Sequence, residues 1–232
     1  MILGFISDAH GNVEAFNKGI SLLVAEGAER LFFLGDAIGY VPSCAVLNAL
    51  DSLGEKIFCI SGNHEAMLLD GRLDLARDAV YQLGFLRTNL PQSQIKMISS
   101  WPVQHREVFD GLSLLLVHGS PEDPTYGYVY PETNLSGFFP DADWVFMGNT
   151  HHPFIREHAG ITYVNIGSCG MPRDDGRFGS AALLDTKTGT ARILRFDISS
   201  ETRQMLEEFP IIHLSVRDLY SRRQSAVFGD FL

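Results

Sequence analysis

MILGFISDAHGN (residues 1–12) is the most informative stretch for the fold, because an apolar run from Ile2 to Ile6 ends directly in a polar cluster. The same arrangement recurs in GDAIGY (35–40), SGNHE (61–65), VHGS (117–120) and GNTHHP (148–153). A short run of β-branched, Leu or Phe residues that stops at Gly or Ser is typical of a buried strand ending in a loop. Since the carboxyl ends of strands in open α/β sheets face one crevice, we expect the five clusters to converge.

The first half of the chain alternates strands with helices. Strands are expected at 2–6, 31–34 and 57–60. Helices are expected after each of them: from Val13 with Asn12 as N-cap, from about Pro42 to Leu53, and in the segment that reaches Leu90. From Trp101 onward, Asp110-Gly111 and Ala159-Gly160 lie between apolar runs and predict β-hairpins, and SAALLD with ARILRF predicts a third.

These patterns predict an α/β protein, a four-layer α-β-β-α sandwich of two mixed sheets with flanking helices. Residues 1–198 are expected to form this domain, and residues 199–232 a helical tail packed on it. Residues 119–141 are expected to form a long irregular loop, and such loops in compact domains are often functional.

Composition narrows the class of partner. A formal net charge of −10 argues against a nucleic-acid polymer or an anionic membrane as the main partner, but it is compatible with a small anion held by metal ions. Cys44, Cys59 and Cys169 lie outside any CxxC pattern, which favours a reducing cytosol over a disulfide framework. No targeting signal or membrane-spanning run is recognisable, so we expect a cytoplasmic protein, with a homo-oligomer left open.

Two of the clusters contain a pair of potential ligands two residues apart. In an extended chain, Asp8 and His10 would leave on the same side and form a chelating pair. By the same reasoning Asn149 and His151 project together, while His152 projects away. The alternative for the first pair is that Asp8 caps the following helix and His10 is a surface histidine.

The remaining clusters each contain a residue with two interpretations. Asn63 can offer a carbonyl oxygen to a hard metal ion and leave His64 free for proton transfer or phosphate contact, or Asn63 can be a helix N-cap. Asp36 can be a ligand or a turn residue, and His118 a ligand or a structural histidine. His105, His158 and His213 lack a strand-exit position and are assigned no role.

Candidate substrate contacts are Asn12, Tyr40 and Arg173. Tyr40 and the loop residues Tyr126, Tyr128 and Tyr130 could stack on a base, or the rings could fill the core of the loop. Arg173 could pair with a phosphate oxygen or with Asp174 or Asp175.

SDAHGN, LGDAIGYVP, GNHE, LVHGSP and NIGSCGMPRD together resemble the calcineurin-like metallophosphoesterase superfamily, in particular its small bacterial and archaeal phosphodiesterases. The family's blocks read D-x-H, G-D, G-N-H-D/E, H and G-H-x-H. The resemblance implies two divalent ions, of Mn, Fe or Zn, with the bridging carboxylate supplied by Asp36. It implies a first metal at Asp8, His10, Asp36 and His151, and a second at Asp36, Asn63, His118 and residue 149.

The resemblance also implies a function. His64 would lie beside the substrate phosphate as general acid or electrostatic stabiliser, and metal-bound hydroxide would attack a small phosphodiester or nucleotide. Asn149 replaces the family's first histidine of G-H-x-H, so the second site is expected to be weaker and to favour Mn²⁺. A phosphomonoesterase and a non-catalytic metal-binding scaffold are the alternatives, and His64 argues against the scaffold.

Overall fold

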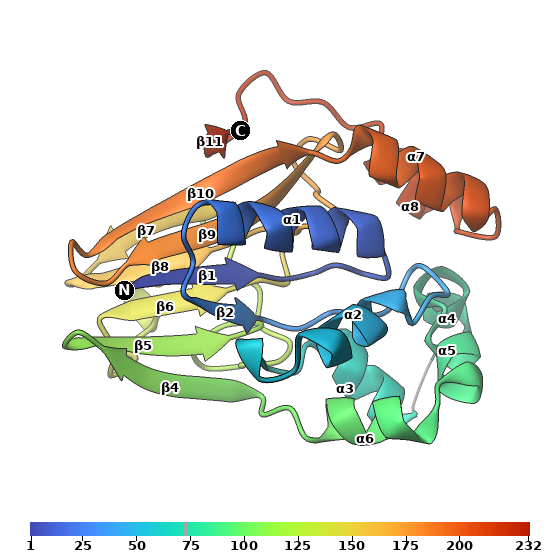
Figure 1. Cartoon of the computed structure of the whole chain (residues 1–232), viewed down its shortest axis with the longest axis horizontal. Coiled ribbons are helices and arrows are strands. Elements are labelled where there is room, and N and C mark those ends of the chain that lie inside the picture. Colours follow the sequence, from blue (N-terminus) through green and yellow to red (C-terminus); the bar gives the residue numbers. More distant parts are fainter. Residues whose placement is uncertain (72–73) are drawn as a thin grey trace.

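Two mixed β-sheets pack face to face in the computed structural model, which describes residues 1–71 and 74–232 (Figure 1). The first sheet has the strand order β11 (Asp230–Phe231), β10 (Thr190–Asp197), β9 (Phe178–Asp185), β1 (Ile2–Ile6), β2 (Arg30–Phe33), β3 (Ile57–Cys59). The second has the order β4 (Gln104–Phe109), β5 (Leu112–Val117), β6 (Trp144–Met147), β8 (Ile161–Asn165), β7 (Phe154–His158). Strands β1 to β3 are mutually parallel, as are β5, β6 and β8. The predicted α/β class with two mixed sheets is confirmed.

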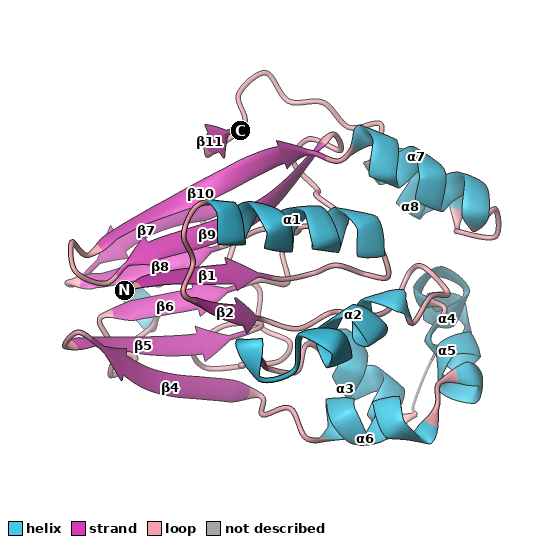
Figure 2. Cartoon of the chain, viewed as in Figure 1, coloured by secondary structure: helices cyan, strands magenta, loops and turns pink. Residues whose placement is uncertain are grey.

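Helices cover the outer face of the first sheet and gather beyond the carboxyl ends of its parallel strands (Figure 2). Those of the first half are α1 (Val13–Ala25), α2 (Ala45–Leu53), α3 (Asn63–Asp70), α4 (Leu75–Tyr81), α5 (Leu83–Asn89) and α6 (Gln92–Ser99). Those of the tail are α7 (Ser199–Glu208) and α8 (Leu214–Leu219). As predicted, the Asn12 side chain caps α1, by accepting from the Ala15 N–H. Residues 72–73, which fall in the helical segment expected up to Leu90, lie outside the described residues.

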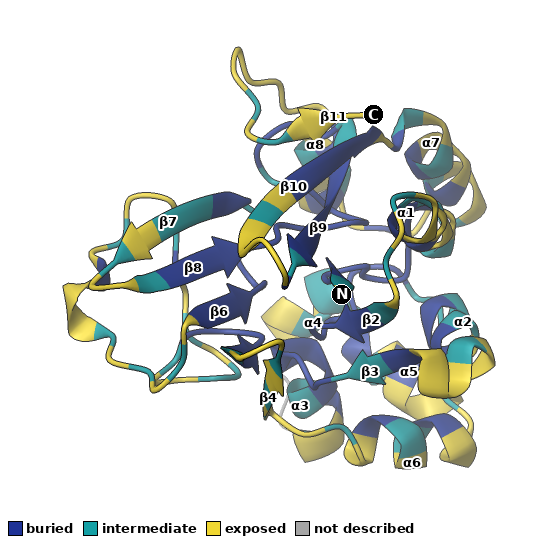
Figure 3. Ribbon diagram, turned by 60° about the vertical axis from the view of Figure 1, so that its left-hand side comes forward, coloured by how far each residue is buried: buried dark blue, intermediate teal, exposed yellow. Residues whose placement is uncertain are grey.

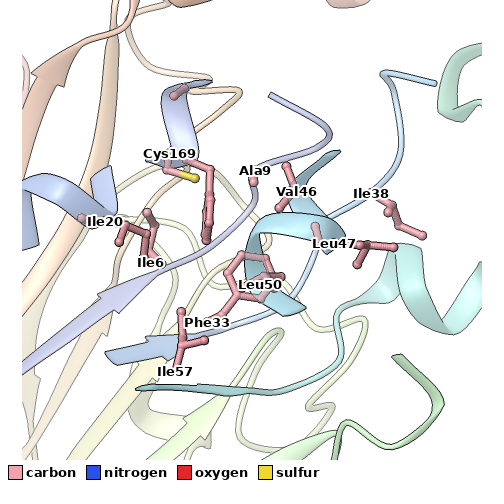
Figure 4. Close-up of a cluster of buried hydrophobic side chains, with 14 of the residues drawn as sticks. Ile6, Ala9, Ile20, Phe33, Ile38, Val46, Leu47, Leu50, Ile57 and Cys169 are labelled. Atoms are coloured by element: carbon pink, nitrogen blue, oxygen red, sulfur yellow. The ribbon is translucent and has the colours of Figure 1, made fainter. Parts of the chain in front are cut away.

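Side chains alternate between two cores along each central strand. Leu3 and Phe5 of β1 face the second sheet, where the Phe5 ring stacks on Phe146 with centroids 3.8 Å apart. Ile6 and Phe33 face the helices, in the cluster that Figure 4 shows. Strands β1 and β2 are therefore buried on both faces, and Figure 3 shows β2 as largely buried. This burial fixes the position of the loops that leave their carboxyl ends.

The outer face of the second sheet is covered by the long segment between β5 and β6. Val129 and Leu135 from this segment pack on Val117, Val145 and Tyr163. Within the described residues, the one regular element of this segment is a 3-10 helix at Leu135–Gly137. The long loop predicted at 119–141 is thus a packed cover for the sheet.

The three predicted hairpins are present as β4–β5, β7–β8 and β9–β10. The second predicted helix begins at Ala45, three residues later than expected from Pro42, because residues 39–43 turn back on themselves through the Val41 N–H to Gly39 C=O and Ser43 N–H to Val41 C=O hydrogen bonds. Among the described residues, no helix is both long enough and apolar enough to cross a membrane.

The tail returns to the first sheet and closes over the loop after β8. Tyr220 of the tail packs with Met171 and Tyr40, and β11 pairs with β10. Arg195 of β10 is fully buried and donates two hydrogen bonds to the Asp174 carboxylate, at 2.6 and 3.1 Å. A charge pair at this depth is tolerated because the arginine also donates to backbone carbonyls of Phe178 and Phe228. The tail and residues 170–175 are therefore held together.

Candidate metal centre

The five polar clusters converge at the carboxyl ends of the parallel strands. Asp8 and His10 follow β1, Asp36 follows β2, and Asn63 and His64 open α3 after β3. His118 follows β5, and Asn149 and His151 follow β6. All of these side chains are buried. Both sheets therefore contribute to one centre, in which His10 and His151 are in contact although they lie 141 positions apart in the chain.

Left-handed backbone conformations aim most of these side chains. The φ angles of Asp8, His10, Asn149 and His151 are 56°, 48°, 63° and 60°. The expectation of an extended chain at these two pairs is therefore wrong, because hydrogen bonds from the Asp8 and His10 N–H groups to the Gly35 and Asp36 carbonyls bend the first loop over the second. Non-glycine residues in this region are strained, and strain of this kind concentrates at functional sites.

The first half of the centre brings two imidazoles and a carboxylate together. The Nε2 atoms of His10 and His151 face each other at 3.0 Å, and the His151 Nε2 lies 3.1 Å from Asp8 Oδ1. Asp36 Oδ2 lies 3.7 Å from the His10 Nε2. Asp8, His10 and His151 lie close enough together to share a single ion, and Asp36 borders this group.

The second half lies on the other side of Asp36. The His118 Nε2 lies 3.4 Å from Asp36 Oδ2 and 2.9 Å from Asn63 Oδ1. Asn149 donates its backbone N–H to Asp8 Oδ2 at 3.2 Å, and its side-chain amide donates to the Gly127 carbonyl at 2.8 Å. That second bond leaves the Asn149 amide oxygen as the atom available to a ligand.

Three histidines are held in one orientation by the backbone. The Nδ1 atoms of His10, His118 and His151 lie 3.0, 2.7 and 2.6 Å from the carbonyl oxygens of Ile38, Leu34 and Met171. Such a bond fixes the tautomer and turns Nε2 toward the centre, as in most metal-ligating histidines. Among the residues that the structure describes, no hydrogen-bond donor reaches the buried Asp8 Oδ1. A divalent cation would supply the missing partner of this carboxylate oxygen and bind the three oriented imidazoles.

The protonation states of the buried groups in the centre follow from their burial and from the charges beside them. Burial holds the pKa of His10 and His151 well below the usual range, so both imidazoles are neutral and can ligate. Burial also opposes protonation of His118, but the carboxylates of Asp36 and Asp8 outweigh it and raise the His118 pKa to about 10. Asp36 is the partner of that cation: despite burial, His118 and His64 hold the pKa of the Asp36 carboxyl below its usual range.

His64 differs from the tethered histidines. Its Nδ1 is buried without a hydrogen-bond partner in the described part of the chain, and its Nε2 lies 3.9 Å from Asp36 Oδ2. The ring is held by packing against the rings of Tyr40, Tyr81 and His10, at centroid distances of 4.7 to 4.8 Å. Burial lowers its pKa. His64 is thus a neutral imidazole at the edge of the centre.

Glu65 is a site residue that the sequence analysis missed. Its buried carboxylate accepts the backbone N–H groups of Asp36, Ala37 and Gly62 at 2.8 to 2.9 Å. Burial and the nearby Asp36 carboxylate raise its pKa to about 7. Glu65 therefore positions the Asp36 loop against the start of α3. A glutamate three residues into a helix is a capping signal that could have revealed it.

The candidate substrate residues are placed differently from one another. Asn12 uses its amide to cap α1 and to donate to the Gly170 carbonyl, a structural role. Arg173 donates to the Tyr40 hydroxyl at 3.1 Å. The alternative pairing of Arg173 with Asp174 or Asp175 is wrong, because those carboxylates pair with Arg195 and Arg177.

The loop tyrosines lie at the surface near the centre. Tyr126 and Tyr128 are about half exposed, at 47% and 52%, so they do not fill a core of the loop. Tyr128 stacks on Tyr130, whose ring lies 5.9 Å from that of His152.

Residues 1–189 match the family model of the calcineurin-like phosphoesterase superfamily domain. A protein of Methanocaldococcus jannaschii is 28% identical over 217 residues, which are 84% of this chain and 87% of that protein. The phosphodiesterase YfcE of Escherichia coli is 24% identical over 198 residues, 80% of this chain and 88% of that protein. The crystal structure of a metallophosphoesterase from Sphaerobacter thermophilus superposes with a TM-score of 0.77 at 24% identity, over 95% of this chain and 98% of that one, which shows a shared fold.

Proposed function

The chain belongs to the calcineurin-like phosphoesterase superfamily, and on this premise we propose that it is a dinuclear-metal phosphodiesterase acting on a small phosphodiester or nucleotide. The observation that carries the proposal is the set of three imidazoles, each tethered at Nδ1, whose Nε2 atoms meet the carboxylates of Asp8 and Asp36. The named phosphodiesterase among the relatives supports the diester as the substrate.

Two overlapping ligand sets would hold the ions. The first is Asp8, His10, Asp36 and His151, and the second is Asp36, Asn63, His118 and Asn149, with Asp36 common to both. Two bound divalent ions would supply an activated water and neutralise charge that develops on the phosphate. His118 would lose its proton on binding an ion, so all imidazole and amide ligands would be neutral. The carboxylates of Asp8 and Asp36 would then be the only negative charges in these sets, and the centre would retain net positive charge for an anionic substrate.

His64 has the role of proton donor to the leaving oxygen, or of hydrogen-bond donor to the phosphate. The untethered Nδ1 supports this, because a ligand histidine is normally fixed by a partner at its second nitrogen. Its packing against Tyr40 and Tyr81 limits ring motion without using a polar atom. A non-catalytic scaffold would have no use for such a histidine.

Metal removal tests the proposal. Protein stripped with a chelator should not hydrolyse bis(p-nitrophenyl) phosphate, and addition of Mn²⁺, Zn²⁺ or Fe²⁺ should restore hydrolysis, with p-nitrophenyl phosphate cleaved more slowly. Undiminished turnover in stripped protein would overturn the metal mechanism. Faster cleavage of the monoester would make the protein a phosphomonoesterase, and no turnover with any of the metals would favour the scaffold.

A further inference from the structure

A pocket of about 440 Å³ lies beside the metal centre and is walled by segments far apart in the sequence. The tyrosines Tyr40, Tyr81 and Tyr130 line it, and the cations Arg173 and Arg222 line it as well. Its volume is within the range of small-molecule sites. Arg222 comes from the tail, which lies beyond residues 1–189 of the family match.

The pocket shares a wall with the metal centre. The Tyr40 ring lies 4.8 Å from the rings of both His10 and His64 and also lines the pocket. Arg173 is joined to the centre through its backbone N–H, which donates to the carbonyl of His151. A substrate held at the centre could therefore extend into this pocket next to Arg173.

The two guanidinium groups lack acidic partners. Within residues 1–71 and 74–232, neither Arg173 nor Arg222 forms an ion pair, whereas the neighbouring Asp174 and Asp175 are already paired with Arg195 and Arg177. The Nε of Arg173 is buried without an acceptor. Arg222 donates to the backbone carbonyl of Arg173, which keeps the two residues adjacent. Paired free cations in a chain of net charge −10 indicate a site for an anion.

The aromatic walls complete the chemistry. Tyr40 and Tyr81 meet edge to face, with centroids 5.0 Å apart, and Tyr130 lines the same pocket beside His152. Tyrosine faces bind nucleobases by stacking, and guanidinium forks bind phosphate. The pocket thus contains aromatic rings that can bind the base of a nucleotide and guanidinium groups that can bind its phosphate.

We propose that this pocket binds the nucleotide part of a nucleoside diphosphate-linked substrate, with one phosphorus at the metals and the adjacent phosphate at Arg173 and Arg222. This inference rests on the proposed function and specifies its substrate class. Hydrolysis would add water to the phosphorus farther from the nucleoside and break its bond to the bridging oxygen. That oxygen keeps the electron pair and becomes part of a nucleoside monophosphate, so the products are two phosphomonoesters. Arg222 is the specificity residue, supplied by the tail.

Arg222→Ala tests the proposal, with Arg203→Ala as the matched control. Both arginines are exposed residues of the tail, but Arg203 does not line this pocket. We expect Arg222→Ala to lower kcat/KM for ADP-ribose by ~10-fold or more through KM, the size of a lost charged hydrogen bond, and to leave bis(p-nitrophenyl) phosphate unaffected. Arg203→Ala should change neither. Equal effects of Arg222→Ala on both substrates, or no effect on ADP-ribose, would overturn the proposal.

A binding measurement separates this proposal from the proposed function. By calorimetry on the full-length protein, AMP should bind more tightly than adenosine. Arg222→Ala should weaken AMP by ~10-fold and leave adenosine unchanged. Tyr81→Ala should weaken both AMP and adenosine. If neither substrate is hydrolysed but these binding results hold, the catalytic function fails and the pocket assignment stands. If the diester is hydrolysed but AMP binds no better than phosphate, the pocket assignment fails alone.

Discussion

The loops at the metal centre and the hairpin turns at the other ends of the strands use the same backbone conformation for different purposes. Asp110 and Ala159 turn the β4–β5 and β7–β8 hairpins at φ 49° and 51°, each followed by a left-handed glycine whose Cα has open space around it. Asp36 has a φ of 60°, but the Gly35 before it lies against the Gly62 backbone and His118. In the hairpins a left-handed residue only reverses the chain direction, whereas at the centre it also orients a side chain toward the candidate metal site.

The strongest test of this comparison makes one chemical change in both regions. Asp36→Asn keeps a residue that tolerates a positive φ but removes the shared carboxylate. We expect turnover to fall by more than the ~10² to 10⁴ of a lost proton-transfer group, with loss of bound metal. Asp110→Asn, the matched control, should leave turnover and metal content unchanged, since the Asp110 carboxylate accepts hydrogen bonds from the Met1 amine and Thr186, far from the centre. Metal analysis and steady-state rates decide it. Equal effects at both positions would remove the distinction.

A second test separates chemistry from metal binding within the centre. His64→Ala should lower the rate by ~10² to 10⁴, because its imidazole has no backbone tether and is free to serve the substrate. Metal content should stay near that of the native protein. The matched variant His118→Ala should lose metal, because His118 is tethered to the Leu34 carbonyl. If His64→Ala loses a full metal equivalent, then His64 is a ligand.

Asn149→His should have a smaller effect, on affinity for the second metal. His tolerates the left-handed backbone of residue 149, and an added imidazole nitrogen would favour Zn²⁺. The expected gain is ~10-fold in affinity at one of two unequal sites, the order of a single contact at a metal site. Titration with Zn²⁺ and Mn²⁺ measures it. Two equally tight equivalents in the native protein, unchanged by the substitution, would show that residue 149 is not a ligand.

The smallest effect is expected at a hairpin. Ala159→Asn places a residue that favours the first position of a type I′ turn where alanine is strained and exposed. Part of the ~1 to 2 kcal/mol cost of a left-handed alanine should be recovered as stability against urea, with no change in the dependence on denaturant. Turnover should be unaffected. A loss of activity would mean that this hairpin communicates with the metal centre.

Local patterns in the sequence predicted the elements and the chemistry of the clusters. The run 2–6 coincides with β1 and the run 57–60 overlaps β3, and Asp110-Gly111 and Ala159-Gly160 turn hairpins as expected. Strand periodicity and turn chemistry depend on neighbours within a few residues, so they can be recognised in a single chain. The same holds for Asp, His and Asn at strand ends, because the carboxyl ends of parallel strands meet by topology.

Tertiary structure decided how those residues act. The Asp8 and His10 backbone is bent by hydrogen bonds to residues 35 and 36, and Glu65 acts on the Asp36 loop across the start of α3. Within the described residues, the Arg173 guanidinium has no carboxylate partner, because the neighbouring Asp174 is paired with Arg195 of β10, 21 positions away in sequence. Tyr40 lines a pocket as well as contacting the centre, because residues of the tail pack near it. Each of these depends on a partner distant in sequence, and no local pattern encodes which partner the folded chain brings within reach.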